Sequence, residues 1–303
     1  IEHVFAMADR QEQAAVIALL RQGDRPWHHY AQLAEAAGSA MAILDGSYAD
    51  PYEQEPLTLF PNAEPPDLDA IAEEIAGWER EAMTFITVLD DSYPVNLRLI
   101  HNRPPFLFVR GAMAAADERS IAVVGTRHPS AQGLVVAREV TEGLAEAGYT
   151  IVSGLAHGID ACAHATALEH ARRTVAVVGT GLRRTYPTDH AELARKIEGA
   201  GAVVSQFWPD SPPSKPSFPM RNITMSGIAL ATVVIEASER SGARMQARFA
   251  LEHGRRVFLH ETLLVHAWAR EYAGRPGTTV VHSAADAVEQ IERLTTPEPA
   301  LTV

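Results

Sequence analysis

The sequence has 303 residues, and its 26 Lys and Arg against 38 Asp and Glu give a formal net charge of 26 − 38 = −12 at pH 7. An apolar fraction of 47% and a charged fraction of 21% are typical of a folded globular chain. The single cysteine, Cys162, excludes an intrachain disulfide framework or a Cys-rich metal site, and favours a reducing, cytoplasmic location. No stretch approaches the about 20 apolar residues that span a bilayer, and residues 1–9 lack a signal-peptide pattern, so we expect no membrane association.

The charge is unevenly distributed. Residues 1–119 contain 8 Arg, no Lys and 20 acidic residues (8 − 20 = −12), which leaves 26 − 8 = 18 basic and 38 − 20 = 18 acidic residues in 120–303. Affinity for a phosphate backbone comes from Lys and Arg, so the overall charge disfavours nucleic acid unless a local basic cluster overrides it. We interpret the acidic first part as a solvated surface, with an acidic face for a protein partner as the alternative.

Residues 1–80 are predicted to form a small helical domain of the helix-hairpin (SAM-like) kind. Apolar residues recur at helical spacing up to Leu44, whereas residues 45–66 are rich in Pro, Asp and Glu and predict a linker. A further helix is predicted over Asp67–Arg80, with Asp67 as its N-cap.

Residues 81–294 are predicted to form an α/β core. Two short strands, Phe85–Leu89 and Phe106–Val109, precede an alternation of strands and helices. The predicted strands are Ser120–Val124, Thr150–Val152, Thr174–Val178, Ala202–Ser205, Ala231–Ile235 and Arg256–Leu259, and the predicted helices are Gln132–Ala147, Ile159–His170, His190–Ala200, Arg221–Ala229 and Arg244–Glu252. Such alternation predicts an extended Rossmann-like, doubly wound, mostly parallel sheet. Residues 295–303 are expected to be a flexible tail.

Ligands of such sheets bind beyond the carboxyl ends of the strands, so the loops there are the candidate sites. In the first loop, Gly125 allows close approach to a ligand and Arg127 offers a planar fork for phosphate. In the second, Gly154 and Gly158 flank His157. Each loop also has a purely structural interpretation, as a tight turn between strand and helix.

The other two loops add further basic and aromatic side chains. The third loop combines Arg183, Arg184 and Tyr186, a composition suited to a sugar-phosphate backbone with a stacked base. In the fourth, Arg221 and Asn222 are expected near the start of a helix, where they could bind an anion or brace the loop. Together these arginines predict a positive groove along one rim of the sheet.

No catalytic or metal constellation stands out to the same degree. The spacing of His157, Asp160 and His164 resembles a metal cluster, but Asp160 suits the first turn of a helix and His164 suits a packed position. Glu236 is the only acid placed at a strand end as a general base would be, and it could instead orient an arginine. We therefore expect no metal, no cofactor and no catalytic residues.

Several motifs in order resemble the DprA/Smf family of DNA-processing proteins. They are IAVVGTRHPSAQG, IVSGLAHGIDACAHATAL, TVAVVGTGLRRTYP, FPMRN and VVIEASERSGARMQARFALEHGRRVF, within about residues 85–290. The resemblance implies a Rossmann-like, non-enzymatic homodimer that binds single-stranded DNA and loads a RecA-type recombinase during DNA uptake or recombination. By motif match it implies DNA contacts at Gly125, Thr126, Arg127, Gly154, His157, Gly158, Arg221 and Asn222, to which the third loop adds Arg183, Arg184 and Tyr186.

The sequence departs from the family pattern at three places on the expected rim: 223–228, 243–247 and 260–262. It also has no segment after Leu294 long enough for the winged helix that many members carry. These departures leave the fold prediction unchanged but leave an altered ligand choice open. The alternative functions are a nucleotide-binding, phosphoribohydrolase-like enzyme that uses Glu236, and a structural or protein-interaction role.

Overall fold

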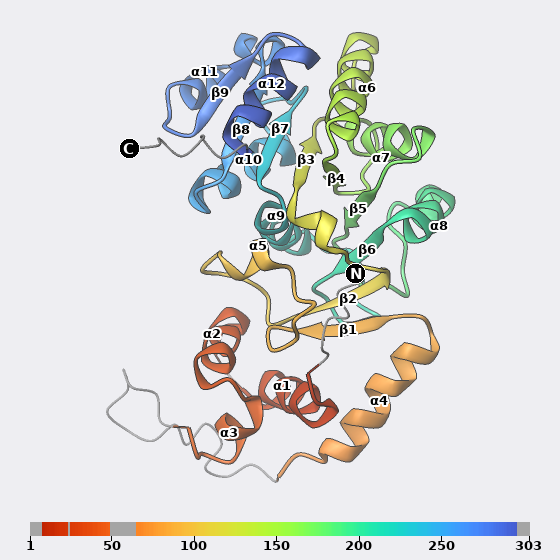
Figure 1. Cartoon of the computed structure of the whole chain (residues 1–303), viewed down its shortest axis with the longest axis vertical. Helices are drawn as coiled ribbons and strands as arrows, with labels where there is room; N and C mark the ends of the chain where they lie inside the picture. The colour runs from red at the N-terminus through yellow and green to blue at the C-terminus, as the bar shows by residue number, and fades with distance from the viewer. Residues whose placement is uncertain (1–7, 24, 49–64, 296–303) are drawn as a thin grey trace, which may run out of the picture.

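The computed structural model describes residues 8–23, 25–48 and 65–295, and its centre is one nine-stranded sheet (Figure 1). The spatial order of the strands is β1-β2-β6-β5-β4-β3-β7-β8-β9. Their bounds are β1 Thr84–Thr87, β2 Phe106–Gly111, β3 Ser120–Val124, β4 Thr150–Ser153, β5 Thr174–Val177, β6 Ala202–Ser205, β7 Ala231–Val234, β8 Arg256–His260 and β9 Thr278–Val281.

The sheet is mostly parallel, as the alternation of strands and helices predicts. β1 pairs antiparallel with β2, and β2 pairs antiparallel with β6, whereas every other neighbouring pair is parallel. The antiparallel pair at one edge therefore extends a parallel core of seven strands, β3 to β9. This confirms the predicted extended, doubly wound α/β architecture.

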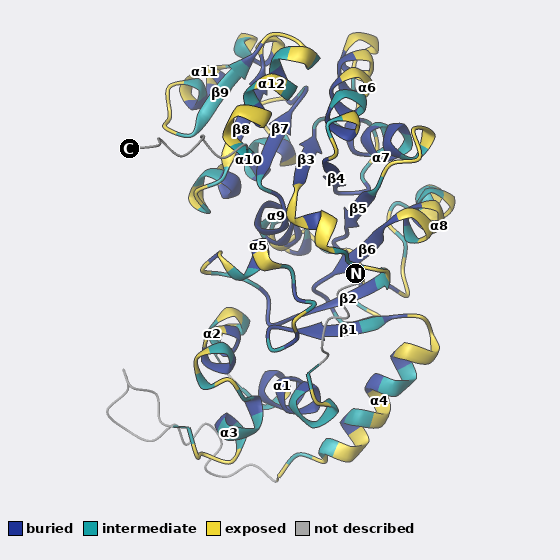
Figure 2. Cartoon of the chain, in the orientation of Figure 1, coloured by how far each residue is buried: buried dark blue, intermediate teal, exposed yellow. Residues whose placement is uncertain are grey.

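Helices cover both faces of the sheet because successive strand residues point to opposite sides. In β3, Ile121 and Val123 pack with α6, α7 and α12, whereas Ala122 and Val124 lie in the cluster that contains α9 and α10. Figure 2 shows buried strands between helices whose outer faces are exposed. The helices after β1 are α5 Val95–Arg98, α6 Ala131–Glu146, α7 Ile159–Glu169, α8 Ala191–Ala200, α9 Ser217–Ile228, α10 Gly242–Glu252, α11 Ala267–Ala273 and α12 Ala284–Thr295, with 3₁₀ turns at Ala115–Glu118, Thr188–His190 and Glu261–Val265.

Most observed bounds lie within two residues of the predicted ones, and two differences are larger. Helix α9 begins four residues earlier than predicted, at Ser217, because Pro219 falls in its first turn, where a missing backbone N–H costs little. Beyond the last predicted strand the chain adds α11, β9 and α12, and β9 extends the sheet beside β8.

Four N-terminal helices lie beside the antiparallel edge of the sheet, where α1 and α4 contact β1 and α3 packs on α1 and α2: α1 Arg10–Gln22, α2 Trp27–Ala37, α3 Ala40–Leu44 and α4 Leu68–Arg80. Their apolar residues belong to the same buried cluster as β1 and β2. The ring of Trp208 lies 4.7 Å from that of Phe106 and 5.8 Å from that of Trp27, centroid to centroid. The N-terminal helices and the sheet therefore share one core.

The beginning of α4 follows the sequence prediction. The Asp67 carboxylate accepts a hydrogen bond from the backbone N–H of Ala70 at 2.9 Å, as an N-cap should. Residues 49–64, most of the predicted linker, and residues 296–303 of the predicted tail lie outside the described residues. Within the described ranges, the structure contains no helix with the length and apolar character to cross a membrane.

The shared core predicts a large effect of a substitution in α4. Trp78 is 3% exposed, and its ring contacts Phe85 and Phe108 at centroid distances of 5.7 and 4.9 Å. Trp78→Ala should lower the free energy of unfolding by about 3–5 kcal/mol in one cooperative transition, because it leaves a cavity in the core. Denaturant unfolding followed by circular dichroism measures this, with exposed Arg80→Ala as the control. A separate early transition for the N-terminal helices would contradict a shared core.

Candidate functional site

The chain reverses its direction of travel across the sheet between β3 and β7. From β3 it continues through β4, β5 and β6, and then returns to place β7 on the other side of β3. In open α/β sheets, such a switch point opens a crevice at the carboxyl ends of the strands. A cleft of about 390 Å³ lies there, and its polar lining includes Thr126, Arg127, Asp160, Arg221, Asn222, Ser238, Arg240 and Gln246.

Two glycines allow the first and second loops to pack closely against each other. A Cβ on Gly125 would lie 2.4 Å from the Ile159 side chain, and a Cβ on Gly158 would lie 2.3 Å from the carbonyl oxygen of Thr126. Gly158 also has a φ of +76°, which disfavours other residues. The backbone of Thr126 joins the loops, because its N–H donates to the Glu236 carbonyl at 2.6 Å and its carbonyl accepts from the Ile159 N–H at 3.2 Å.

The side chain of Arg221 is buried beneath the second loop. Its exposed fraction is 6%, and its Nη1 donates to the Val177 carbonyl oxygen at 2.8 Å. A Cβ on Gly154, the residue after β4, would lie 1.7 Å from the same Nη1, so a larger residue there would displace the buried guanidinium. The group that approaches Gly154 is thus a side chain of this protein.

Asp160 is a buried carboxyl group that interacts electrostatically with Arg221. Burial raises the pKa of the Asp160 carboxyl, and the positive charge of Arg221 together with backbone amides of the surrounding loops opposes that rise. Burial likewise lowers the pKa of Arg221, which Asp160 opposes and the charge of Arg127 reinforces. Each group thus favours the charged form of the other.

Arg127 and two aromatic rings form the outer part of the site. The Arg127 guanidinium lies over the Phe218 ring at 5.5 Å from its centroid, and the Tyr186 ring lies 5.8 Å from Phe218. A smaller pocket is lined by these three residues with Gly154, His157, Gly179 and Pro187. It shares Arg127, Ala156, Phe218 and Arg221 with the cleft, so we call the two together the groove.

Arg183 and Arg184 are not among the residues that line the groove. Arg183 forms ion pairs of 2.6 Å with Glu81 and with Asp210, and Arg184 donates from Nε to the Asp210 carbonyl oxygen at 2.9 Å. The first of these pairs joins the residue after α4 to the third loop across 102 residues. The structure therefore brings Arg127 and Arg221 together, whereas Arg183 is paired with two carboxylates and Arg184 is bound to a backbone carbonyl.

Sequence reasoning did not single out Phe218, Arg240 and Gln246, which line the groove. Phe218 supplies the ring under Arg127, Gln246 is buried on α10, and Arg240 lies exposed in the loop after β7. Among the described residues, the Arg240 guanidinium has no hydrogen-bond or ion-pair partner. The sequence signal that could have identified Arg240 is its position in the loop after β7, at the switch point of the sheet. Asn222, which was predicted, is buried and donates to the Gly242 carbonyl at 3.3 Å.

Glu236 is engaged at the start of α6. Its carboxylate accepts hydrogen bonds from the backbone N–H and the hydroxyl of Ser130, the latter at 2.9 Å. A carboxylate held in this way caps a helix N-terminus, and it orients neither Arg221 nor Arg244.

Among the altered motifs, Ala243 and Gln246 line the cleft, whereas His260 bonds Thr262 at the start of a 3₁₀ turn.

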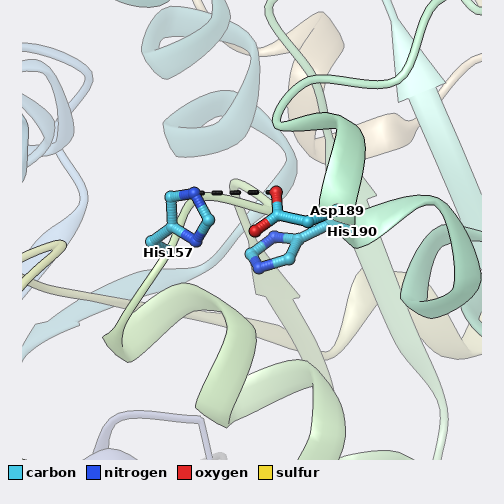
Figure 3. Close-up of side chains that lie close together, drawn as sticks. All are labelled: His157, Asp189 and His190. Carbon is cyan, nitrogen blue, oxygen red and sulfur yellow. Dashed lines mark ion pairs between the residues drawn. The ribbon is translucent and has the colours of Figure 1, made fainter.

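The three residues with metal-like spacing take different environments. His164 is fully buried and its Nδ1 bonds the Thr174 hydroxyl at 2.7 Å, so it has the packed position expected of it. Asp160 is buried near Arg221, while His157 lies at the rim beside Asp189 and His190 (Figure 3).

Comparison with known proteins assigns the family. The sequence pattern of the family described as DNA recombination-mediator protein A matches residues 84–297. The chain belongs to this family. It is 34% identical over 224 residues to DNA processing protein DprA of Bacillus subtilis, covering 72% of this chain and 74% of that protein. It is 44% identical over 167 residues to protein Smf of Escherichia coli, covering 55% of this chain and 45% of that protein.

Solved structures of DprA proteins share the architecture. DprA from Streptococcus pneumoniae matches with a TM-score of 0.70 and 27% identity, covering 94% of this chain and 99% of that one. DprA from Helicobacter pylori, whose structure was described for its single-stranded DNA binding mode, matches with a TM-score of 0.62 and 22% identity, covering 70% and 96% of the two chains. The fold that carries the groove is thus shared with these two structures.

His164 beneath the groove predicts a pH dependence of stability. Burial lowers the pKa of its imidazole to about 3, with the charge of Arg221 as the next cause, whereas an unfolded His titrates near 6.5. As the pH falls, the unfolded chain therefore binds a proton at His164 before the folded protein does. The contribution of the neutral His164 to stability is present above about pH 6.5 and is lost as the pH falls toward 3. His164→Asn should flatten the slope of unfolding free energy over pH 4–6 by about 1.4 kcal/mol per pH unit.

Urea unfolding at several pH values measures that slope. The exposed His128→Gln provides the matched control, and it should keep the slope of the unsubstituted protein. Equal slopes in His164→Asn and the unsubstituted protein would show that His164 is not held neutral.

Proposed function

We propose that the groove binds single-stranded DNA and that the protein acts in this way as a recombination mediator for a RecA-type recombinase. The observation that carries the proposal is the groove, whose lining combines Arg127, Arg221 and Arg240 with the rings of Tyr186 and Phe218. Positive charges that follow a backbone and aromatic faces that stack bases are the two components of single-strand binding.

The local charge of the groove favours a polyanion despite the net charge of −12. Its lining contains three arginines, and Asp160, which is buried, is its only carboxylate among the described residues. Arg127 and Arg240 are exposed and have no carboxylate partner there. They are therefore available to phosphate oxygens.

The aromatic pair favours single strands over duplex. Tyr186 is 42% exposed and stands at the smaller pocket beside Phe218. In a duplex the base faces are stacked on one another, whereas an unpaired base can lie on an exposed ring, a contact worth about 1–3 kcal/mol per base. Arg183 and Arg184 in this proposal brace the third loop that carries Tyr186, rather than contact DNA.

The family description supports the wider role. A recombination mediator acts together with a recombinase, and the DprA of Helicobacter pylori is described as binding single-stranded DNA. By this likeness we propose a RecA-type recombinase as the protein partner and a homodimer as the working form. Light scattering of the purified protein tests the second point.

The proposal predicts the effect of removing one groove cation. Arg127→Ala should weaken binding to a dye-labelled oligo-dT about fivefold at 0.1 M salt, and should reduce the slope of log affinity against log salt by about 0.7. The physical reason is the loss of one counterion release per complex. Fluorescence anisotropy over a salt series measures both quantities.

Arg195→Ala is the matched control. Arg195 lies on α8, pairs with Glu192 and is 71% exposed, so its loss changes the net charge equally without touching the groove. The affinity and slope of this variant should equal those of the unsubstituted protein. Equal losses in both variants would assign the effect to net charge and refute the groove as the binding site.

A further inference from the structure

Three potential metal ligands meet at the rim of the smaller pocket. His157 follows β4, whereas Asp189 and His190 belong to the 3₁₀ turn before α8. Each offers one ligand atom, and the three atoms lie within 4.8 Å of one another. Figure 3 shows the two imidazoles and the carboxylate grouped at one place. Two separate loops therefore bring together a set that the sequence spacing of His157, Asp160 and His164 did not reveal.

The distances are close to those of a metal site. Nε2 of His157 lies 3.7 Å from Oδ1 of Asp189, and the ring centroids of His157 and His190 lie 4.6 Å apart. Ligand atoms about 2.0–2.1 Å from a tetrahedral Zn²⁺ are separated by about 3.3 Å. The side chains of His157 and Asp189 are 46% and 66% exposed, so small rotations can bring the ligands to that separation.

His190 is oriented by a second contact. Its Nδ1 lies 2.9 Å from the carbonyl oxygen of Leu155. A carbonyl oxygen can only accept, so Nδ1 carries the proton and Nε2 of the neutral ring carries the lone pair. Such a bond from the second nitrogen to a backbone carbonyl is the usual support of a metal-binding histidine.

The donor set indicates the class of metal. Two imidazoles and one carboxylate suit Zn²⁺ and similar divalent transition metals, whereas Mg²⁺ and Ca²⁺ prefer sites made of oxygen atoms. Three protein ligands leave a fourth position for water or another oxygen ligand. Because His157 also lines the smaller pocket, that position adjoins the groove.

We propose that His157, Asp189 and His190 bind one divalent transition metal ion of the Zn²⁺ class. This proposal stands on the geometry of the three side chains and does not depend on DNA binding. A comparison cluster exists on the surface, where Glu142, Glu146 and His170 also approach one another. That cluster offers two carboxylates and one imidazole, a set less suited to Zn²⁺.

The test uses the full chain without a histidine tag, stripped of metal by a chelator. Co²⁺ should bind one ion per chain with visible absorption, and one equivalent of Zn²⁺ should displace it. In Zn²⁺ titration calorimetry, His157→Ala and Asp189→Asn should each weaken binding at least tenfold, because loss of even a supporting contact costs about 10–100-fold. His170→Ala, the matched control, should leave the affinity unchanged.

The outcomes separate the possibilities. Thermal melting without metal should be the same for the Asp189→Asn variant and the unsubstituted protein, since the Asp189 side chain is exposed. Absence of saturable Zn²⁺ binding at millimolar concentration would overturn the proposal. So would equal affinity in all variants, or a loss confined to His170→Ala.

Discussion

The burial of the Arg221 guanidinium under the second loop is the constraint on which the groove depends. A buried charge is costly unless hydrogen bonds and an opposite charge compensate it. Here the Val177 carbonyl accepts one of its N–H groups, and Asp160 supplies the opposite charge. The missing side chain of Gly154 provides the space. The Arg221 side chain thereby links α9 to the carboxyl ends of β4 and β5.

The acidic partners of the arginines determine which positive charges at the rim remain available to a ligand. Arg221 contributes positive potential from below, while Arg127 and Arg240 contribute from the loops after β3 and β7. Arg183 carries the same charge, yet Glu81 and Asp210 neutralise it. The number of arginines near the sheet edge is thus a poor guide to its potential, and the distribution of their acidic partners decides it.

Most of the fold could be predicted from local sequence patterns. The bounds of β3 and β6 were predicted to the residue, because short apolar runs between turn signals are unambiguous. The elements after β8 were not predicted: α12 has the apolar spacing of an amphipathic helix and was overlooked, whereas β9 has an intermediate burial pattern and α11 only seven residues. Neither produces the strong periodicity that such predictions need.

The candidate site was predictable only in part. The rule that ligands bind after parallel strands led to Arg127, Gly154 and Arg221, which the structure does bring together. It could not show that Glu81, 102 residues away, pairs with Arg183, nor that His190 approaches His157. Such neighbours are set by tertiary packing, and no spacing along the chain encodes them.

The central claim is that groove guanidiniums neutralise the phosphates of an unpaired strand. The most direct measurement is the affinity of the unsubstituted protein for oligo-dT and for a duplex of equal length over a salt series. The account predicts tighter binding of the single strand, with a slope of log affinity against log salt of about −1.4 to −2.1, from two or three phosphates at about 0.7 each. Tighter binding of the duplex, or single-strand affinity that does not change with salt, would contradict it.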